Sequence, residues 1–295
     1  MFNPFKIFSL SEDSEWEVLS KRSSPRMSYA DYAYMIKLLA RSPWLYHYYP
    51  QLEDTVIKLA KTLEERKLLQ KLFRKFRWVS NKENGKLIEK IVHKIRENWN
   101  CTQKDTMIIS TSYKEDNEPD GSLVLIYDIM NQLSQWEDNN FVKSFSRDEI
   151  PSYNVKKIIL CDDFIGSGGT IEKRVKFIKQ VLPNVEIFVV SIACMKSALK
   201  RINKVCPYVY APIILDPSID VHDTSSSDYI TMVGMESKLH SKWKKYNLEQ
   251  CSMGWGKAGA TYKHEKYRIP NNCFPIFWWG KLVNGSDLNS IFLRP

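Results

Sequence analysis

The chain has 295 residues, of which 43% are apolar, and it carries a formal net charge of +9. A chain of this size and apolar content can bury a core, and no uninterrupted apolar stretch reaches the ~20 residues of a membrane span. The start, MFNPFKIFSLSEDSEWE, has acids where a secretory signal needs an apolar segment. We therefore expect a soluble, cytoplasmic protein that makes no membrane contact.

The six cysteines are scattered along the chain and form no CxxC pair. They stand at positions 101, 161, 194, 206, 251 and 273. Cys161 and Cys194 lie inside apolar runs, which favours reduced, packed thiols over disulfides or zinc ligands. No metal site follows from the cysteines.

Residues 1–100 show the apolar spacing of helices. Apolar side chains recur every three or four positions in two segments, with Asn84-Gly85 near a boundary: Leu52, Val56, Leu59 and Leu63, then Leu87, Ile91, Ile95 and Trp99. We therefore divide the chain into a helical module, residues 1–100, and a second domain, residues 101–295.

Charge is unevenly distributed along the chain. Residues 51–100 hold 13 lysines and arginines against seven acids, whereas residues 101–150 hold four against ten. The basic excess includes the stretch KLFRKFRW, whose cations are Lys71, Arg74, Lys75 and Arg77. Cations beside aromatic rings could grip a phosphate backbone and stack on bases, so these residues are candidates for nucleic-acid contact. The alternative is a solvated helix face.

From about residue 105, short apolar runs alternate with amphipathic segments. The runs predict strands at residues 107–109, 158–161 and 187–193, and the segments between them predict helices at residues 123–133 and 171–182. This order is typical of an α/β fold with a mostly parallel sheet flanked by helices. The predicted fold class is therefore α/β with an N-terminal helical module.

The rest of the chain is expected to surround this sheet. Residues 209–215 predict a further strand, which Pro212 places at an edge of the sheet. Residues 228–248 predict a helix. The segment YRIPNNCFPIFWWG is too rich in Pro, Asn and aromatic residues for a simple helix, and we expect it to cap the sheet.

The loop after the strand at residues 158–161 has the composition of a phosphate site. Its glycines and hydroxyl side chains are Gly166, Ser167, Gly168, Gly169 and Thr170. Glycines let backbone amides converge, hydroxyls donate hydrogen bonds, and the N-terminus of the following helix favours an anion. The preceding acids, Asp162 and Asp163, fit sugar hydroxyls or a magnesium ion on the same ligand. The sequence therefore predicts a sugar phosphate at the carboxyl end of this strand.

Three other motifs could indicate a different kind of ligand site. A strand ending in two acids also occurs in P-loop NTPases, but GxxxxGK[ST] is absent from the chain. GWGKAG, residues 254–259, fits GxGxxG, yet it follows a helical stretch rather than a strand, so we interpret it as a turn. His222 with its neighbouring acids is interpreted as a solvated polar loop rather than a metal site.

The run IILCDDFIGSGGT resembles the phosphoribosyl pyrophosphate (PRPP) motif of type I phosphoribosyltransferases. The resemblance lies in four apolar residues, an acidic pair and a small-residue loop that ends in threonine, while Phe164 and Gly166 depart from the common pattern. It implies that Asp162 and Asp163 hold the ribose hydroxyls and that residues 166–170 hold the 5′-phosphate. It also implies that a magnesium ion accompanies PRPP.

A second resemblance extends over nearly the whole chain. The helical beginning, the DDFIGSGGT loop, GWGKAGATY, the PNNCFPIFW run and the closing IFLR are similar to phosphoribosyltransferase-like proteins of bacterial conflict systems, some of which are retron effectors. This resemblance implies a toxin effector in antiviral defence against phage. Its partners would be a retron reverse transcriptase and the RNA–DNA product of that enzyme.

Catalysis would depend on the surroundings of the departing pyrophosphate. The loop TSYKEDNEPDGS follows the strand at residues 107–109, and Ser112, Tyr113 and Lys114 are candidate donors, although four acids share the loop. About twenty residues separate the next helix from the strand at residues 158–161, which leaves little room for a mobile flap. Two functions stay open: an enzyme that transfers or hydrolyses a ribosyl phosphate, and a non-catalytic sensor of a ribose phosphate nucleotide.

The C-terminal aromatic run is the candidate base site. A planar base needs a flat apolar surface with polar groups at its edge, and the rings at residues 277–279 with Asn271 and Asn272 supply both. Neighbouring side chains in an extended segment point opposite ways, so one of Trp278 and Trp279 should line the pocket opposite the phosphate loop. Base binding is therefore assigned to Asn271, Asn272 and Trp278.

Overall fold

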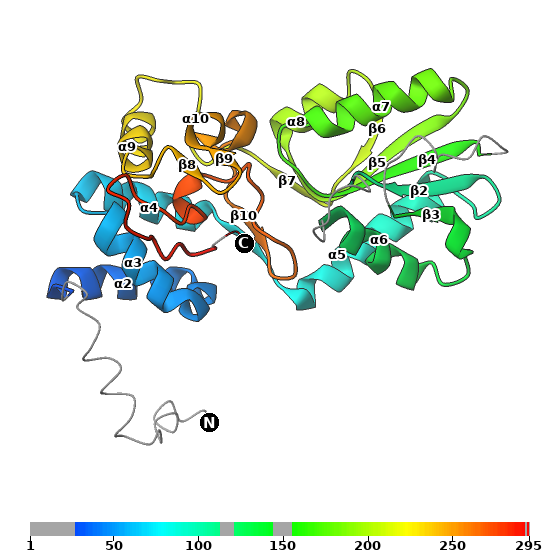
Figure 1. The fold of residues 1–295 in the computed structure, drawn as a ribbon. Helices are drawn as coiled ribbons and strands as arrows, with labels where there is room; N and C mark the ends of the chain where they lie inside the picture. Colours follow the sequence, from blue (N-terminus) through cyan, green and yellow to red (C-terminus); the bar gives the residue numbers. More distant parts are fainter. Residues whose placement is uncertain (1–26, 113–120, 144–154, 293, 295) are drawn as a thin grey trace, which may run out of the picture.

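A computed structural model of the chain describes residues 27–112, 121–143, 155–292 and 294. Figure 1 shows these residues as two lobes that lie side by side. We name the described part of residues 81–215 the sheet lobe, and residues 27–80 together with the described part of residues 216–294 the cap lobe. The two ends of the chain therefore build one lobe around a continuous middle segment that builds the other.

The sheet lobe is organised by a six-stranded sheet in the order β3-β2-β4-β5-β6, with β7 also paired to β5. All of its strand pairs are parallel. The strands are β2 (Thr106–Ser110), β3 (Phe141–Val142), β4 (Lys157–Ile165), β5 (Glu186–Met195), β6 (Tyr208–Tyr210) and β7 (Ile213–Leu215). The central strands are buried along nearly their whole length, as parallel strands covered on both faces require.

Helices cover both faces of this sheet (Figure 1). The helices on one face are α7 (Gly169–Val181) and α8 (Lys196–Ile202). Those on the other face are α5 (Asn81–His93), which continues into the π-helical turn η2 (Lys94–Asn98), and α6 (Gly121–Gln132). The 3₁₀ turn η3 (Asp138–Asn140) leads into β3. The predicted α/β class with a mostly parallel sheet flanked by helices is confirmed.

The cap lobe combines N-terminal helices with C-terminal segments. Its N-terminal elements are α2 (Tyr29–Arg41), η1 (Pro43–Tyr48), α3 (Tyr49–Leu59), α4 (Leu63–Lys75) and β1 (Arg77–Val79). Its C-terminal elements are α9 (Ser227–Glu236), β8 (Lys242–Trp243), β9 (Tyr246–Asn247), α10 (Leu248–Cys251), η4 (Trp255–Lys257), β10 (Tyr262–His264) and η5 (Pro275–Phe277). α2 and α4 each begin with a capping box, at Ser28 and at Thr62. In each box the hydroxyl of the capping residue accepts a hydrogen bond from the backbone N–H of the third helical residue, and the carboxylate of that residue accepts one from the backbone N–H of the capping residue.

Three predicted elements differ from the structure in extent. The strand predicted at residues 158–161 continues to Ile165, because β4 pairs with β5 over that whole length. The strand predicted at residues 209–215 is broken at Ala211-Pro212 into β6 and β7, both at the edge of β5. The helix predicted at residues 228–248 ends at Glu236, and a β8–β9 hairpin follows it.

The predicted division of the chain at residue 100 differs from the boundary between the lobes. β1 pairs in parallel with β10, so an N-terminal segment and a C-terminal segment share one small sheet. α5 belongs instead to the sheet lobe, where it packs on α6 and β5. Residues before position 100 therefore contribute to both lobes.

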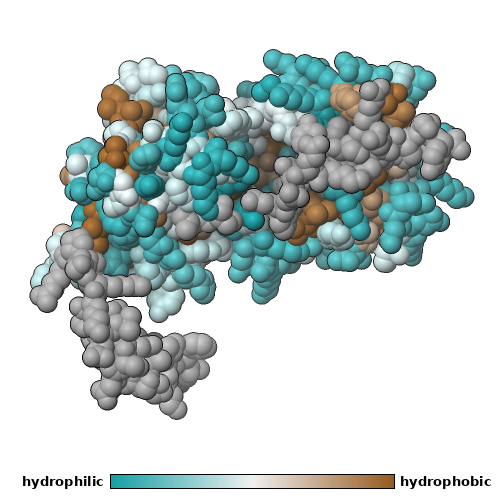
Figure 2. Space-filling view, viewed as in Figure 1, coloured by the Kyte–Doolittle hydropathy of each residue, from teal (hydrophilic) through white to brown (hydrophobic). Residues whose placement is uncertain are grey.

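The surface and the thiols agree with a packed globular chain. In Figure 2 hydrophilic side chains cover most of the visible surface of both lobes, and apolar colour is limited to small patches. No described helix combines the length and apolar character needed to cross a membrane. All six cysteines are buried and carry free thiols, as their apolar surroundings predicted. Across the described residues, no cluster of three His, Cys, Asp or Glu side chains offers a metal site.

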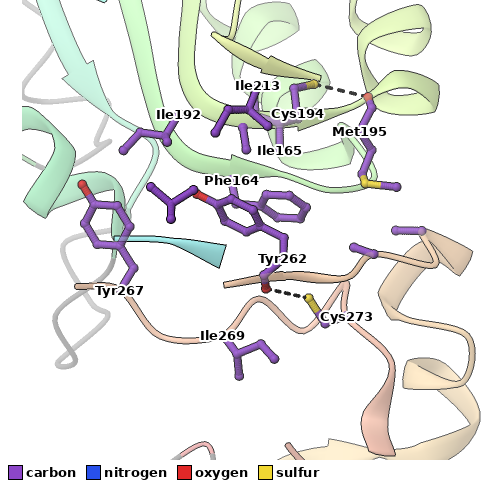
Figure 3. Packing of buried hydrophobic residues seen from close by; sticks show 14 of the residues in the cluster. Phe164, Ile165, Ile192, Cys194, Met195, Ile213, Tyr262, Tyr267, Ile269 and Cys273 are labelled. Carbon is purple, nitrogen blue, oxygen red and sulfur yellow. Dashed lines mark hydrogen bonds between the residues drawn. The ribbon is translucent and has the colours of Figure 1, made fainter. Parts of the chain in front are cut away.

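The two lobes meet through buried aromatic and aliphatic side chains (Figure 3). The Phe164 ring on β4 stacks on the Tyr262 ring on β10, with 4.7 Å between the ring centroids and 14° between the planes. Both side chains are almost completely buried, and such a pair contributes about 0.5–1.5 kcal/mol beyond the area that it buries. The carboxyl end of the central strand is thus fixed against the cap lobe.

A polar network joins the lobes beside this stack. The buried His264 accepts a hydrogen bond at Nδ1 from the Lys266 backbone N–H at 3.1 Å, so its Nε2–H donates to Asn84 Oδ1 at 3.0 Å. Asn84 Nδ2 donates to Asp128 Oδ2 at 2.9 Å, and Lys266 forms an ion pair with the same carboxylate. Burial, and next the neighbouring Lys263, lower the pKa of His264 from 6.5 to about 4. The neutral imidazole is therefore the form that fits this junction.

Acid should weaken the junction through His264. Its stabilising contribution is fully present above pH 6.5 and is lost as the pH falls toward 4, because the unfolded chain takes up the proton first. The loss should reach about 3 kcal/mol at most. His264→Gln should remove this dependence from the free energy of urea unfolding measured between pH 4 and 7. The exposed His222→Gln is the control, and equal pH slopes in both variants would contradict the assignment.

Candidate functional site

The candidate phosphate loop lies where β4 passes into α7. β4 ends at Ile165, residues 166–168 form the turn, and α7 begins at Gly169. Gly168 has a left-handed backbone with φ of 74°, a conformation that glycine adopts without a side-chain penalty. The turn therefore directs the amino end of a 13-residue helix toward the carboxyl edge of the sheet.

A polar pocket of about 130 Å³ opens at this loop. Both lobes line it, and its lining is Asp162, Phe164, Ile165, Gly166, Ser167, Gly168, Thr170, Ile171, Trp255, Asn271 and Asn272. Thr170 is exposed, Ser167 and Asp162 are partly buried, and Asn272 is buried. The structure therefore brings the predicted loop residues together with both predicted asparagines.

The cap lobe contributes a turn, residues 253–259, that fits closely over the loop. Asn272 Nδ2 donates to the Trp255 carbonyl at 2.8 Å, and the Trp255 backbone N–H donates to the Asn271 carbonyl at 2.9 Å. A Cβ on Gly166 would overlap the Asn272 side chain, and a Cβ on Gly256 would lie 2.7 Å from Ser167 Cβ. Glycine is needed at both positions because the two lobes approach each other here.

The turn is anchored from behind by a buried carboxyl group. Glu236, at the end of α9, accepts hydrogen bonds from Ser252 Oγ at 2.6 Å and from the Met253 backbone N–H at 3.1 Å. Burial raises the pKa of Glu236 to about 7, although both hydrogen bonds act in the opposite direction. Met253 has a left-handed φ of 60°, so this anchor holds a backbone conformation that a non-glycine residue rarely adopts.

An arginine that the sequence did not single out lies at the rim of the loop. Arg201 on α8 donates from Nε to Glu172 Oε2 at 2.5 Å and from Nη1 to the Ser167 carbonyl at 3.4 Å. Hydrogen bonds from Lys176 and then Arg201 lower the pKa of Glu172 to about 2. No motif marks Arg201, because α8 reaches the loop only through the pairing of β4 with β5.

The two acids of the predicted motif do not face the same side. Asp162 lines the pocket, whereas the carboxyl group of Asp163 lies against Gly121 at the start of α6. Both residues belong to β4, and successive side chains of a strand point to opposite faces. The expectation that both acids stand in the turn is therefore wrong, and Asp162 is the acid placed at the pocket.

The second predicted loop is described only at its two ends, residues 111–112 and 121–122. Ser112 is buried, and its backbone N–H donates to Ser110 Oγ at 3.1 Å, while Ser110 Oγ lies 2.7 Å from Ser122 Oγ. Arg174 on α7 donates to the Thr111 carbonyl at 3.1 Å. Tyr113 and Lys114, the other candidate donors, lie outside the described residues.

Trp278 does not take the predicted place at the pocket. Trp278 and Trp279 both have no exposed surface, and neither lines the pocket. Trp278 Nε1 donates to the Cys273 carbonyl at 3.0 Å, and its ring packs edge-on against Tyr246. The aromatic residues that line the pocket are instead Trp255, which is 41% exposed, and the buried Phe164. The signal for Trp255 was the GWGKAG segment, which the sequence identified as a turn without a ligand role.

Most cations of the predicted basic stretch make contacts with other segments of the protein. Lys71 pairs with Asp228, Lys75 Nζ donates to the Ser218 carbonyl at 2.9 Å, and Arg77 pairs with Glu83. Arg74 is exposed. These contacts join α4 and β1 to neighbouring segments. Nucleic-acid contact at this stretch stays a prediction.

Comparison with known proteins identifies the chain at the level of family. A family model, PRTase-CE, matches residues 60–293. The chain belongs to the PRTase-CE family. This PRTase-CE protein is therefore phosphoribosyltransferase-like, and the matched residues include the loop, the pocket and most of the cap lobe.

Two solved structures show distant similarity to this PRTase-CE chain. The xanthine-guanine-hypoxanthine phosphoribosyltransferase of Helicobacter pylori matches with 14% identity and a TM-score of 0.32, over 48% of this chain and 84% of its own. The AQ2163 protein of Aquifex aeolicus matches with 11% identity and a TM-score of 0.31, over 59% of this chain and 85% of its own. No curated protein matches the sequence.

The contact between Gly256 and Ser167 can be tested with a matched glycine. Gly256→Ala and Gly285→Ala should each cost about 1–2 kcal/mol of stability, because both glycines have positive φ. Only Gly256→Ala should also displace the loop, since a Cβ on Gly285 meets open space. We expect it to weaken binding of ribose 5-phosphate, the predicted ligand, by about tenfold in calorimetric titration. Equal affinity in both variants would contradict this geometry.

The anchor at Glu236 should give a pH effect of the opposite sign to that of His264. The folded carboxyl keeps its proton to about pH 7, whereas the unfolded one loses it near 4.5, so its contribution to stability falls as the pH rises through this window. Glu236→Gln should abolish this fall and leave the variant up to about 3 kcal/mol more stable than wild type at pH 8. Urea unfolding of the exposed Glu249→Gln is the control. If the free energy of unfolding of wild type and of Glu236→Gln changed with pH in the same way, the raised pKa of Glu236 would be refuted.

Proposed function

We propose that the pocket binds the 5′-phosphoribosyl group of PRPP or a related nucleotide. One observation carries this proposal: the hydroxyl-bearing Ser167 and Thr170 line the same small polar pocket as the carboxylate of Asp162. Hydroxyls suit a phosphate and a carboxylate suits sugar hydroxyls, so one ligand that carries both groups matches the pocket. The volume of about 130 Å³ suits a phosphate with its sugar better than a whole dinucleotide.

The phosphate would lie at the amino end of α7. The first backbone N–H groups of a helix have no partner within the helix, and the helix dipole favours negative charge there. Gly168 precedes this amino end with a left-handed backbone and lines the pocket. Arg201 donates to the Ser167 carbonyl at the rim while its Nε pairs with Glu172.

The ribose and a magnesium ion would share Asp162. Mg²⁺ prefers one or two carboxylates together with phosphate oxygens, so Asp162 and the ligand's own pyrophosphate make a suitable donor set. When bound, the ion would neutralise charge on the departing pyrophosphate. Asp162 itself would accept hydrogen bonds from the ribose hydroxyls and orient the sugar.

The acceptor would bind on the cap-lobe side of the pocket. Trp255 offers a half-exposed ring face, and Asn271 and Asn272 lie beside it with paired donors and acceptors. Ring face and amide edge suit a planar base. We therefore propose that Trp255, in place of Trp278, is the aromatic residue that contacts the base.

The second candidate function is a sensor that binds the ligand without turning it over. The position of Asp163 favours it, since only one acid of the pair is at the pocket and Asp163 lies across the strand against Gly121. A pocket with one carboxylate can hold a ribose phosphate. Its described lining holds no second carboxylate of the kind that the motif's resemblance implies for ribose and metal.

The biological setting belongs to the same proposal. We propose that the protein acts as a phosphoribosyltransferase-like effector in bacterial defence against phage, with a retron reverse transcriptase and its RNA–DNA product as partners. This part is supported by the resemblance of the sequence motifs to conflict-system proteins.

Binding at the pocket can be measured with ribose 5-phosphate. Thr170→Val removes a hydroxyl without changing side-chain size, and Asp162→Asn removes a charge. Each should weaken the affinity by about ten- to a hundredfold, because each removes a hydrogen bond that involves a charged or sugar group. Calorimetric titration checks this, with exposed Thr224→Val and Asp220→Asn as controls. If all four variants bind like wild type, the pocket is not the ligand site.

The same proteins distinguish an enzyme from a sensor. Wild-type protein incubated with PRPP and magnesium should release pyrophosphate if it is an enzyme, and Asp162→Asn should not. Binding of PRPP without pyrophosphate release, with and without added nucleobases, would instead favour the sensor.

A further inference from the structure

A row of lysines runs along the outer side of α5 and its π-helical extension. Lys82, Lys86 and Lys90 are exposed and Lys94 is partly exposed, and they follow one another every four residues. Four residues advance a helix by about 6 Å, so the ammonium groups form a line rather than a cluster. Like charges at this spacing destabilise a helix, so helix formation does not explain the row.

Within the described residues, these ammonium groups form no ion pairs. Some partly or fully exposed lysines elsewhere sit in ion pairs, for example Lys58 with Asp54, Lys71 with Asp228, Lys176 with Glu172 and Lys266 with Asp128. In the described part of the chain, none of the four lysines of the α5 row has such a carboxylate partner. The row therefore offers its full charge to a partner outside the chain.

The row forms one wall of a groove of about 540 Å³. Its lining is Lys86, Glu89, Lys90, His93, Lys94, Asn98 and Tyr210. Tyr210 comes from the edge strand β6, and Lys94 Nζ lies 5.7 Å from the centre of its ring and 5.8 Å from the centre of the Trp99 ring. Tyr208, on the same edge strand, is 44% exposed. Cations and aromatic rings thus lie side by side in this groove.

We propose that this groove binds single-stranded nucleic acid. A line of cations can follow a phosphate backbone, and aromatic rings beside it can stack on unpaired bases. An acidic protein would use the cations but not the ring faces. A membrane surface would need apolar side chains to insert, and the groove lining has none apart from the tyrosine ring.

The groove is separate from the proposed phosphoribosyl pocket. α5 lies on the face of the sheet opposite α7 and α8, and no residue lines both cavities (Figure 1). The proposal therefore does not depend on the function of the pocket. It also differs in location from the basic stretch at Lys71, whose cations are used in contacts between segments of the protein.

The test measures binding of a fluorescein-labelled 20-nucleotide oligothymidine by fluorescence anisotropy at several salt concentrations. The variant is the triple substitution Lys86→Gln, Lys90→Gln and Lys94→Gln. It should weaken binding at low salt at least tenfold and reduce the slope of log K against log salt by about two, near 0.7 for each lost contact. Glutamine is a good helix former and relieves the repulsion, so thermal stability should not fall.

Two controls give the test its specificity. Lys37→Gln, Lys61→Gln and Lys67→Gln together remove the same charge from exposed positions in the cap lobe and should leave affinity within about twofold of wild type. Tyr210→Leu keeps the charge but removes the ring, and should weaken binding by about tenfold through lost stacking.

The proposal is overturned if the two triple variants lose affinity equally, because net charge alone would then explain binding. It is also overturned if wild type binds the oligonucleotide no better than vesicles of anionic lipid, or binds it independently of salt. Ribose 5-phosphate affinity should be unchanged in the Lys86, Lys90 and Lys94 variant. A failure at the groove would therefore leave the pocket proposal standing, and the converse also holds.

Discussion

The stack of Phe164 on Tyr262 is the contact on which the candidate site depends. Phe164 follows the acidic pair on β4, and Tyr262 begins β10, ten residues before Asn272. Their packing brings the cap-lobe turn onto the loop so closely that Gly166 and Gly256 leave no room for a Cβ. The pocket exists only in the docked arrangement of the lobes. A ligand that touches Ser167 and Trp255 together binds that arrangement alone, and so stabilises it by mass action.

Local sequence patterns predicted the sheet and the candidate phosphate loop. The features that were mispredicted depend on packing between parts of the chain that are distant in sequence. Four elements could be recognised because each has its own apolar pattern. They are the strands at residues 107–109, 158–161 and 187–193 and the helix at residues 171–182. Trp278 was misplaced for a physical reason. The alternation argument assumed an extended chain, but η5 coils residues 275–277 and the Trp279 N–H donates to the Pro275 carbonyl, so both indoles turn into the core.

The acidic pair was recognised from the sequence as part of a motif, but the directions of its two side chains were not predicted. The sequence placed Asp162 and Asp163 in a turn, where two neighbouring carboxylates can converge on one sugar. Pairing of Ile165 with Cys194 extends β4 past both acids and sends them to opposite faces. Nothing in the pattern before residue 162 signals this extension, because it is imposed by the length of β5. The register of one strand pair therefore decides how many acids reach the pocket.

α5 connects the two surfaces that the structure offers to ligands. Its buried side carries Asn84, which holds the His264 junction between the lobes, and its outer side carries the lysine row from Lys82 to Lys94. The groove is thus built on the helix that also contributes to lobe docking, and the pocket is built by that docking. Any ligand that changes the position of α5 must act on the hydrogen bonds of Asn84 with His264 and Asp128. Binding free energies are reciprocal, so a coupling through Asn84 would act equally in both directions.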